Sequence, residues 1–294
     1  MDKKEWIKQA KAKQQEVLDI LKNGIKELVT SEKWTEYLKF QTAFHRYSFC
    51  NSMLIMLQRP TATYVKGFKQ WKTEFERDVK KTEAKNGIAI LAPLIRKVKK
   101  YKDNPETGEK EESFYEELYG FKTVYVYDVE QTEGKPLPEN LHQRTGGNDA
   151  QWLLDCLVKV ARGIGYTVNF EDIGKADGRC DCHKKEITIN PIHPVNHQAS
   201  VMAHEIGHAI LHPEDNEHSR GDKEFEAESV AFSVMHRFGV TSGSYSFPYI
   251  VVWQNGDLEE CIKKFESNCE RIQRTSSRII RLVEELVVQK SVAA

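Results

Sequence analysis

The sequence has no apolar run long enough to cross a membrane, and its first residues do not form a signal peptide. Residues 1–6 lead into an amphipathic helical pattern instead of an apolar segment. The six cysteines do not have the spacing of a small disulfide-stabilised secreted domain. We therefore expect a cytoplasmic protein, with no membrane partner, whose thiols are mostly reduced.

Net charge is also nearly absent, at −1, but the charges are unevenly distributed. The segment 41–100 holds thirteen Lys and Arg against four Asp and Glu, and aromatic residues are interleaved with these cations. Cations that follow phosphates and rings that stack on bases are typical of proteins that bind single-stranded nucleic acid. The alternative is that several rings belong to the core and the cations form a solvated face.

The residues that organise the chain are His204-Glu205-Ile206-Gly207-His208, within an apolar helical segment. Two histidines four residues apart lie on one helix face, so their imidazoles can bind a single zinc ion. Glu205 lies beside them and can accept a proton from a water at the metal without being a ligand. The pattern predicts a catalytic Zn²⁺ site, with His204 and His208 as ligands and Glu205 as general base.

A third ligand must come from elsewhere in the chain. A metzincin would have glycine and histidine where this chain has Leu211 and Glu214, which excludes that class. A gluzincin takes a glutamate from a following helix, which residues 224–232 can form. We rank Glu224 first as the ligand and keep Glu228 as its supporting residue or as an alternative ligand. Glu226 would point away from both and be solvated.

The remaining patterns predict an α+β protein with domains at 1–140 and 148–294, separated by a Gly- and Pro-containing linker. Helices are expected at 3–29, 32–57, 149–163 and 258–286, with a hairpin at 102–117. The run 185–190 is expected to be an edge strand before the zinc-binding helix. Cys180 and Cys182 alternate along a strand, and a structural role for them is favoured over metal binding. The last helix is expected to pack within the protein, with a dimer seam as the alternative.

Several short motifs resemble those of ArdC-type antirestriction proteins. In the N-terminal half, the motifs that resemble the single-stranded-DNA-binding domain of this family are Trp34-Thr35-Glu36-Tyr37-Leu38, Phe44-His45-Arg46-Tyr47-Ser48, Gln58-Arg59-Pro60 and Gly120-Phe121. The C-terminal half is similar to the ImmA/IrrE group of metallopeptidases, through 204–212, 224–232 and 245–250. One departure is the loop 80–87, which is longer than in the family and lacks its early glycine.

The resemblance implies a protein of a mobile element or phage that binds single-stranded DNA and a zincin-like domain that cleaves a protein substrate. The residues expected to contact DNA are Arg46, Tyr47, Asn51, Arg59, Lys66, Trp71, Lys80 and Lys81. The function predicted is that of a single-stranded-DNA-binding zinc metallopeptidase of antirestriction type. The alternative is a non-catalytic DNA-binding module whose zinc site is structural or vestigial. Tyr245 or Tyr249 is a candidate to stabilise the oxyanion.

Overall fold

The computed structural model describes residues 2–28, 31–103, 110–137, 150–214, 218–240 and 258–292. The fold is α+β, as predicted, and the chain forms two compact units. Unit 1 comprises Met1–Leu21 and Leu57–Lys135, and unit 2 comprises Lys22–Met56 and Pro136–Ala294. Within the described ranges, no helix has the length and apolar character needed to span a membrane.

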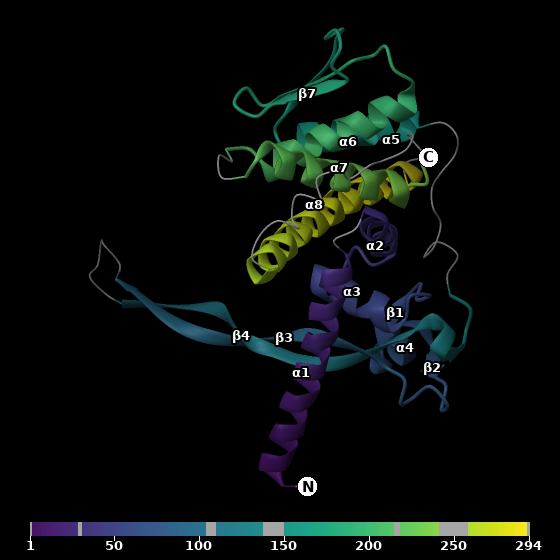
Figure 1. The fold of residues 1–294 in the computed structure, drawn as a ribbon, viewed down its shortest axis with the longest axis vertical. Helices are drawn as coiled ribbons and strands as arrows, with labels where there is room; N and C mark the ends of the chain where they lie inside the picture. Colours follow the sequence, from purple (N-terminus) through teal and green to yellow (C-terminus); the bar gives the residue numbers. More distant parts are fainter. Residues whose placement is uncertain are drawn as a thin grey trace. The chain divides into compact units, whose positions relative to one another are not determined.

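Unit 1 is built on a long two-stranded ribbon, which Figure 1 shows as β3 and β4. β3 (Ile88–Asp103) and β4 (Lys110–Asp128) pair antiparallel, with an irregularity between Leu94 and Ile95. This pairing confirms the predicted hairpin. The other elements of this unit are α1 (Lys3–Glu27, shared with unit 2), β1 (Val65–Gly67), α4 (Phe68–Phe75), β2 (Arg77–Val79), η1 (Val129–Gln131) and β5 (Thr132–Gly134).

One buried carboxylate closes the base of the ribbon. Asp128 is completely buried and accepts hydrogen bonds from the backbone N–H groups of Thr63 at 2.9 Å, Tyr64 at 3.1 Å and Glu130 at 3.1 Å. A buried carboxylate is tolerated only when such donors replace its hydration. Asp128 therefore fixes the turn that follows β4 against the start of β1.

Unit 2 stacks helices on a small sheet. Its sheet has the order β6-β8-β7, formed by β6 (Thr167–Phe170), β8 (Glu186–Ile189) and β7 (Gly178–Asp181). In Figure 1, α7 (Arg220–Arg237) lies between α6 (Val195–Leu211) and α8 (Leu258–Val292). α8 packs on α5 (Gln151–Gly163), α6 and α7, so its apolar stripe is covered by its own chain, which was the favoured prediction.

The segment 22–56 belongs to unit 2 because its aromatic residues complete the core of that unit. Trp34 of α2 (Ser31–Ala43) is fully buried and packs against Phe225 in a tilted contact and against Phe265 edge to face, at centroid distances of 5.3 and 5.5 Å. Its indole N–H donates to Ser229 Oγ at 3.0 Å. The compact units therefore divide the chain differently from the predicted boundaries 1–140 and 148–294.

Two predicted elements need correction. The single helix expected over 32–57 is two helices, α2 and α3 (Phe49–Gln58), because the backbone turns at 44–48 and Ser48 Oγ accepts from the Asn51 N–H at 3.4 Å, at the start of α3. The run 185–190 is not an edge strand. β8 lies in the middle of its sheet, and β7 is the edge strand that packs against α6.

An ion pair between α7 and α8 makes the stability of unit 2 depend on pH. Burial raises the pKa of Glu284, but hydrogen bonds from His45 and Arg237 outweigh it and lower the pKa to about 2. A carboxylate with a depressed pKa stabilises the fold above its ordinary pKa of 4.5, and this contribution is lost as the pH falls toward 2. We expect Glu284→Gln to lower the free energy of unfolding at pH 7 and to have little effect near pH 2.

Urea denaturation of the full-length protein at several pH values measures this difference. Glu285→Gln is the matched control, because the neighbouring Glu285 is exposed and should change the unfolding midpoint little at any pH. A Glu284→Gln effect of equal size at pH 7 and at pH 2 would contradict the assignment.

Candidate metal centre

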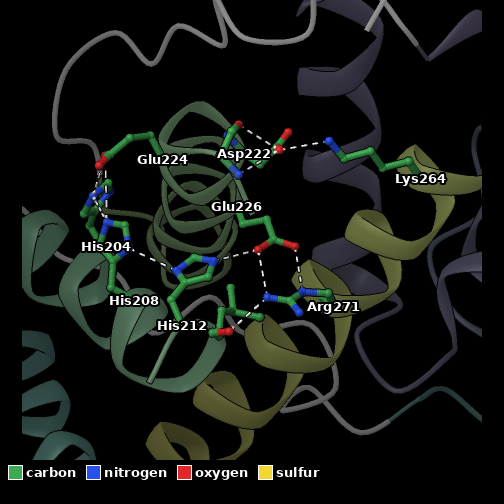
Figure 2. Close-up of polar contacts among 10 residues, drawn as sticks. His204, His208, His212, Asp222, Glu224, Glu226, Lys264 and Arg271 are labelled. Atoms are coloured by element: carbon green, nitrogen blue, oxygen red, sulfur yellow. Dashed lines mark hydrogen bonds and ion pairs between the residues drawn. The ribbon is translucent and has the colours of Figure 1, made fainter. Parts of the chain in front are cut away.

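The start of α7 is fixed by a hydrogen-bonded cap. Ser219 Oγ accepts from the Asp222 N–H at 3.2 Å, and the Asp222 carboxylate accepts from the Ser219 N–H at 3.3 Å. Lys264 of α8 donates to the same carboxylate at 3.0 Å (Figure 2). The cap fixes where α7 begins, and residues four apart on the helix share a face. Glu224 and Glu228 lie on one such face, and both contact His204 of α6.

Three side chains from α6 and α7 converge on one point. His204 Nε2 and His208 Nε2 lie 3.0 Å apart, and Glu224 Oε2 lies 3.4 Å from the first and 3.8 Å from the second. Figure 2 shows the two rings and the carboxylate pointing toward one another. Ligands at about 2.0–2.1 Å from a tetrahedral zinc are separated by roughly 3.3 Å. The spacing of these three atoms therefore fits a divalent metal ion.

Hydrogen bonds at the far side of each ring leave the Nε2 lone pairs free for such an ion. His204 Nδ1 lies 3.2 Å from Glu228 Oε2, and a carboxylate can only accept. The hydrogen of a neutral His204 is therefore assigned to Nδ1. His208 Nδ1 lies 3.1 Å from His212 Nδ1. The geometry favours Glu224 as the ligand and Glu228 as the residue that orients His204.

His208 is oriented by a chain of contacts that the sequence analysis missed. His212 Nε2 lies 2.7 Å from Glu226 Oε2, and Glu226 Oε1 accepts from Arg271 Nε at 2.8 Å. With hydrogens on His208 Nδ1 and His212 Nε2, every contact in this chain pairs a donor with an acceptor. Burial lowers the pKa of His212 despite the opposing effect of Glu226, which is consistent with a neutral ring. The predicted solvation of Glu226 is wrong, because Glu226 is completely buried.

The charges around the rings favour a cation. Burial lowers the pKa of His204, but hydrogen bonds with Glu224 and Glu228 outweigh it and raise the pKa to about 10. Hydrogen bonds with His204 and His208 hold the pKa of Glu224 far below its usual range. The position between these groups thus stabilises positive charge, and a metal ion can replace the proton there.

Glu205 lies beside this point without joining the ligand set. Burial is the main cause that raises the pKa of its carboxyl, and the backbone N–H of Cys180 is one of its partners. β7 can approach Glu205 because residue 178 is glycine: a Cβ there would lie 2.9 Å from Glu205 Oε1 and would also clash with Val201. Gly178, which the motif does not reveal, therefore makes room for the carboxyl.

The centre opens into a cleft of about 670 Å³ that runs from β7 to α7. Its lining includes Cys180 and Cys182, whose Sγ atoms lie 3.6 Å apart. Among the described residues, neither thiol belongs to a potential metal-binding cluster, and the structural role of the two cysteines stays a prediction. Tyr245 and Tyr249, the candidates for the oxyanion, lie outside the described residues.

The residues predicted to contact DNA divide between the two units. In unit 2, Arg46 and Tyr47 line a cavity of about 480 Å³ together with Arg274 and Arg281 of α8. Asn51 is half-buried on α3. In unit 1, three of the predicted cations have partners within the protein. Arg59 contacts the Glu130 carboxylate at 3.0 Å, Lys66 contacts Glu74 at 3.3 Å, and the Lys80 ammonium donates to the Glu130 carbonyl at 2.8 Å. Lys81 is exposed.

Trp71 does not fit the role predicted for it. The ring is completely buried, and its N–H donates to the carbonyl of Tyr127 at 2.8 Å. A ring in this environment has no free face for a base, so Trp71 is a core residue of unit 1. On the same helix, Phe68 is 51% exposed and is the better candidate for stacking.

The fold and the site define a protein that joins a mixed α/β N-terminal region to a zincin-like domain. Residues 8–127 match the family described as the N-terminal domain of anti-restriction factor ArdC. Residues 161–241 match the IrrE N-terminal-like domain. The chain therefore carries regions that match both models, and this combination supports an ArdC-type protein.

Two similar solved structures are crystal structures of the antirestriction protein ArdC from plasmid R388, one metal-free and one Mn(II)-bound. They are 19% and 18% identical to this chain, each with a TM-score of 0.47. In both cases the match covers 81% of this chain and 84% of the other. Comparison with curated proteins gives no match.

The ion pair between the buried Glu226 and the partly exposed Arg271 provides a test of how His208 is held. We expect Glu226→Gln to leave Arg271 without its charged partner and to lower the free energy of unfolding by about 1–3 kcal/mol, because water can solvate part of the guanidinium. Because the single uncharged amide oxygen must then serve both His212 and Arg271, His212 is held less firmly, and Zn²⁺ affinity should fall by about 10- to 100-fold. Urea denaturation and competition with a chromophoric chelator measure the two effects.

Glu226→Gln/Arg271→Met, which removes both charges, should recover part of the stability but not the metal affinity. Glu214→Gln, at an exposed glutamate near the end of α6, is the control and should change neither. Unchanged Zn²⁺ affinity in folded Glu226→Gln protein would show that the chain of contacts does not orient His208.

Proposed function

We propose that this ArdC-type protein is a zinc-dependent peptidase that also binds single-stranded DNA, acting in the cytoplasm on behalf of a mobile element or phage. The observation that carries the peptidase part is the convergence of His204 Nε2, His208 Nε2 and Glu224 Oε2 beside a buried Glu205. Two imidazoles and one carboxylate with a free position are the ligand set of catalytic zinc.

A zinc ion held by these residues would lower the pKa of water to about 7 and polarise a peptide carbonyl. Glu205 removes the proton from the attacking water and passes it to the departing amine. A carboxyl whose pKa is raised by burial is a stronger base than a solvated carboxylate, which suits the removal of the proton from water. Glu228 and His212 keep the imidazoles in the orientation that the reaction needs.

A structural zinc site is the alternative, and the position of Glu205 speaks against it. Glu205 is only 7% exposed and is not one of the three converging ligands. Burying a carboxyl that holds no metal lowers stability. A purely structural site gains nothing from such a group, whereas a hydrolytic site requires it.

Glu205→Gln tests the proposal directly. The amide has nearly the same shape but cannot accept the proton, so we expect the variant to retain Zn²⁺ affinity and to lose hydrolysis by at least about 100-fold. A complex mixture of proteome-derived peptides, analysed by mass spectrometry for new termini, allows detection without a known substrate. Zinc-loaded wild-type protein should generate termini that Glu205→Gln protein does not.

Identical termini from the two proteins, or equal protection of incoming DNA from restriction in cells, would refute a catalytic role. The second result would favour the non-catalytic DNA-binding module. Glu214→Gln serves again as the carboxylate-to-amide control and should match the wild type in both assays.

The DNA-binding part rests on cations and rings in each unit. In unit 2, Arg46, Arg274 and Arg281 surround one cavity with Tyr47. In unit 1, Phe68 is exposed on α4 next to Lys69. Guanidinium groups bind phosphates, and an exposed ring can stack on an unpaired base. This combination supports binding of single strands in preference to duplex DNA.

We expect the affinity of the full-length protein for a labelled thymidine oligonucleotide to fall steeply with salt, by a slope of about −0.7 per phosphate contact on a log–log plot. Arg46→Ala/Arg281→Ala should weaken binding and reduce this slope. Arg278→Ala, at an exposed arginine of α8 outside the cavity lining, is the matched control. Fluorescence anisotropy gives both values; a flat salt dependence or a preference for duplex would exclude the proposal.

A further inference from the structure

A second cluster of ligand-type side chains lies outside the centre described above. Asp177 Oδ1 is 2.8 Å from His193 Nε2, and Asp177 Oδ2 is 3.0 Å from His197 Nε2. The two imidazole rings lie 4.7 Å apart between centroids. One potential ligand atom from each residue lies within 4.8 Å of the others. Among the described residues, this and the first centre are the two clusters with such geometry.

The cluster is held by a buried side chain that links its two segments. Asn190 is 1% exposed, and its amide donates to the carbonyls of Gly174 at 3.2 Å and Ala176 at 3.1 Å. Its backbone N–H donates to the Asp177 carbonyl at 2.9 Å, and its Oδ1 accepts from the Ile192 N–H at 3.2 Å. The loop before β7 and the turn before α6 are thus fixed to each other.

The start of α6 positions the two histidines. His193 directly precedes Pro194, the residue that caps α6, and His197 lies in the first turn of the helix. Gln198 donates to the His193 carbonyl at 2.6 Å, which holds the turn. The ligand atoms are therefore brought together by the backbone and by side chains that are not ligands themselves. Such preorganisation is what a metal site requires of its surroundings.

The donor set indicates the kind of ion. Two imidazole nitrogens and one carboxylate suit Zn²⁺ and other first-row divalent metals, whereas Ca²⁺ and Mg²⁺ prefer oxygen ligands. The three side chains are 33–49% exposed, so water can complete the coordination sphere. The hydrogen bond from His197 lowers the pKa of Asp177 and keeps its carboxylate ionised.

We propose that Asp177, His193 and His197 form a second binding site for a divalent first-row metal ion, with Zn²⁺ as the preferred occupant. Asp177 and His197 line the same cleft as His204 and Glu205. The site therefore lies on the rim of the cleft, where open coordination positions can take an oxygen ligand. Asp177 also directly precedes Gly178, against which Glu205 lies, so a bound ion would hold this wall of the cleft in place.

Zinc titration of the full-length, chelator-treated protein tests the proposal. Competition with a chromophoric chelator should reveal two Zn²⁺ per chain in the wild type and one in His193→Ala/His197→Ala, with the first step unchanged. His183→Ala, at an exposed histidine outside both clusters, is the matched control and should retain two. Glu224→Ala should weaken the other step and leave this one intact. A wild type that binds one ion, or a double variant that still binds two, would overturn the proposal.

Asp177→Asn provides a second test if the double variant does not fold. The amide keeps the size of the side chain but removes its charge, so the second binding step should weaken by about tenfold or more. Circular dichroism establishes whether each variant is folded before titration. An Asp177→Asn protein that binds the second Zn²⁺ as tightly as the wild type would show that the cluster is a hydrogen-bonded link between two loops.

Discussion

The metal centre depends on how closely α6 and α7 approach each other. At their contact, Gly207 faces Ala227, and a Cβ on residue 207 would lie only 3.2 Å from the Ala227 Cα. Glycine costs about 1 kcal/mol relative to alanine within a helix. That cost is offset here because the two backbones come close enough for the short Glu224 side chain to reach both imidazoles. Gly207, which directly precedes the second motif histidine, is therefore as important to the geometry as the histidines themselves.

The close approach of α6 and α7 also brings three carboxylates of α7 to the histidines of α6, and each contacts a different ring nitrogen. The three glutamates of α7, at 224, 226 and 228, occupy three different positions around the histidines of α6. Glu226 is balanced by Arg271, while the ion pairs of Glu224 and Glu228 among the described residues are with histidines. A divalent ion at the point where His204 and His208 converge would supply positive charge beside Glu224.

The sequence predicts contacts between residues that are close in the chain better than contacts between residues that are far apart in it. His204, Glu205 and His208 belong to one helical turn, so their spacing alone predicts their relative positions. Glu224 was ranked first from spacing, and its carboxylate lies near Nε2 of both histidines, whereas Glu228 contacts Nδ1 of His204. The orientation of Glu226 was predicted wrongly because its partners, His212 and Arg271, lie 14 and 45 residues away. The sequence alone does not show that Arg271 of α8 faces α7.

The same limit explains the errors in the N-terminal half. Trp71 lies in a basic, aromatic segment that resembles a nucleic-acid-binding surface, but its burial depends on Tyr127, 56 residues further along the chain. The helix break at 44–48, by contrast, has a local signal that the sequence analysis missed, because Ser48 Oγ accepts from the Asn51 N–H at the start of α3. Local periodicity predicted where helices and strands occur. It did not predict which side chains are exposed, because exposure depends on residues far away in the chain.

Glu205 connects these observations to function. Its carboxyl is buried, and lost hydration raises its pKa although the neighbouring His204 and His208 act to lower it. Glycine at 178 leaves the space that the carboxyl occupies, although glycine in a strand lowers stability. Two residues that lower stability, Gly178 in β7 and the buried Glu205 in α6, thus lie together at the Glu205 carboxyl. An apolar side chain at 205 would avoid the cost of burying a carboxyl, and the proton transfer proposed for Glu205 accounts for its presence there.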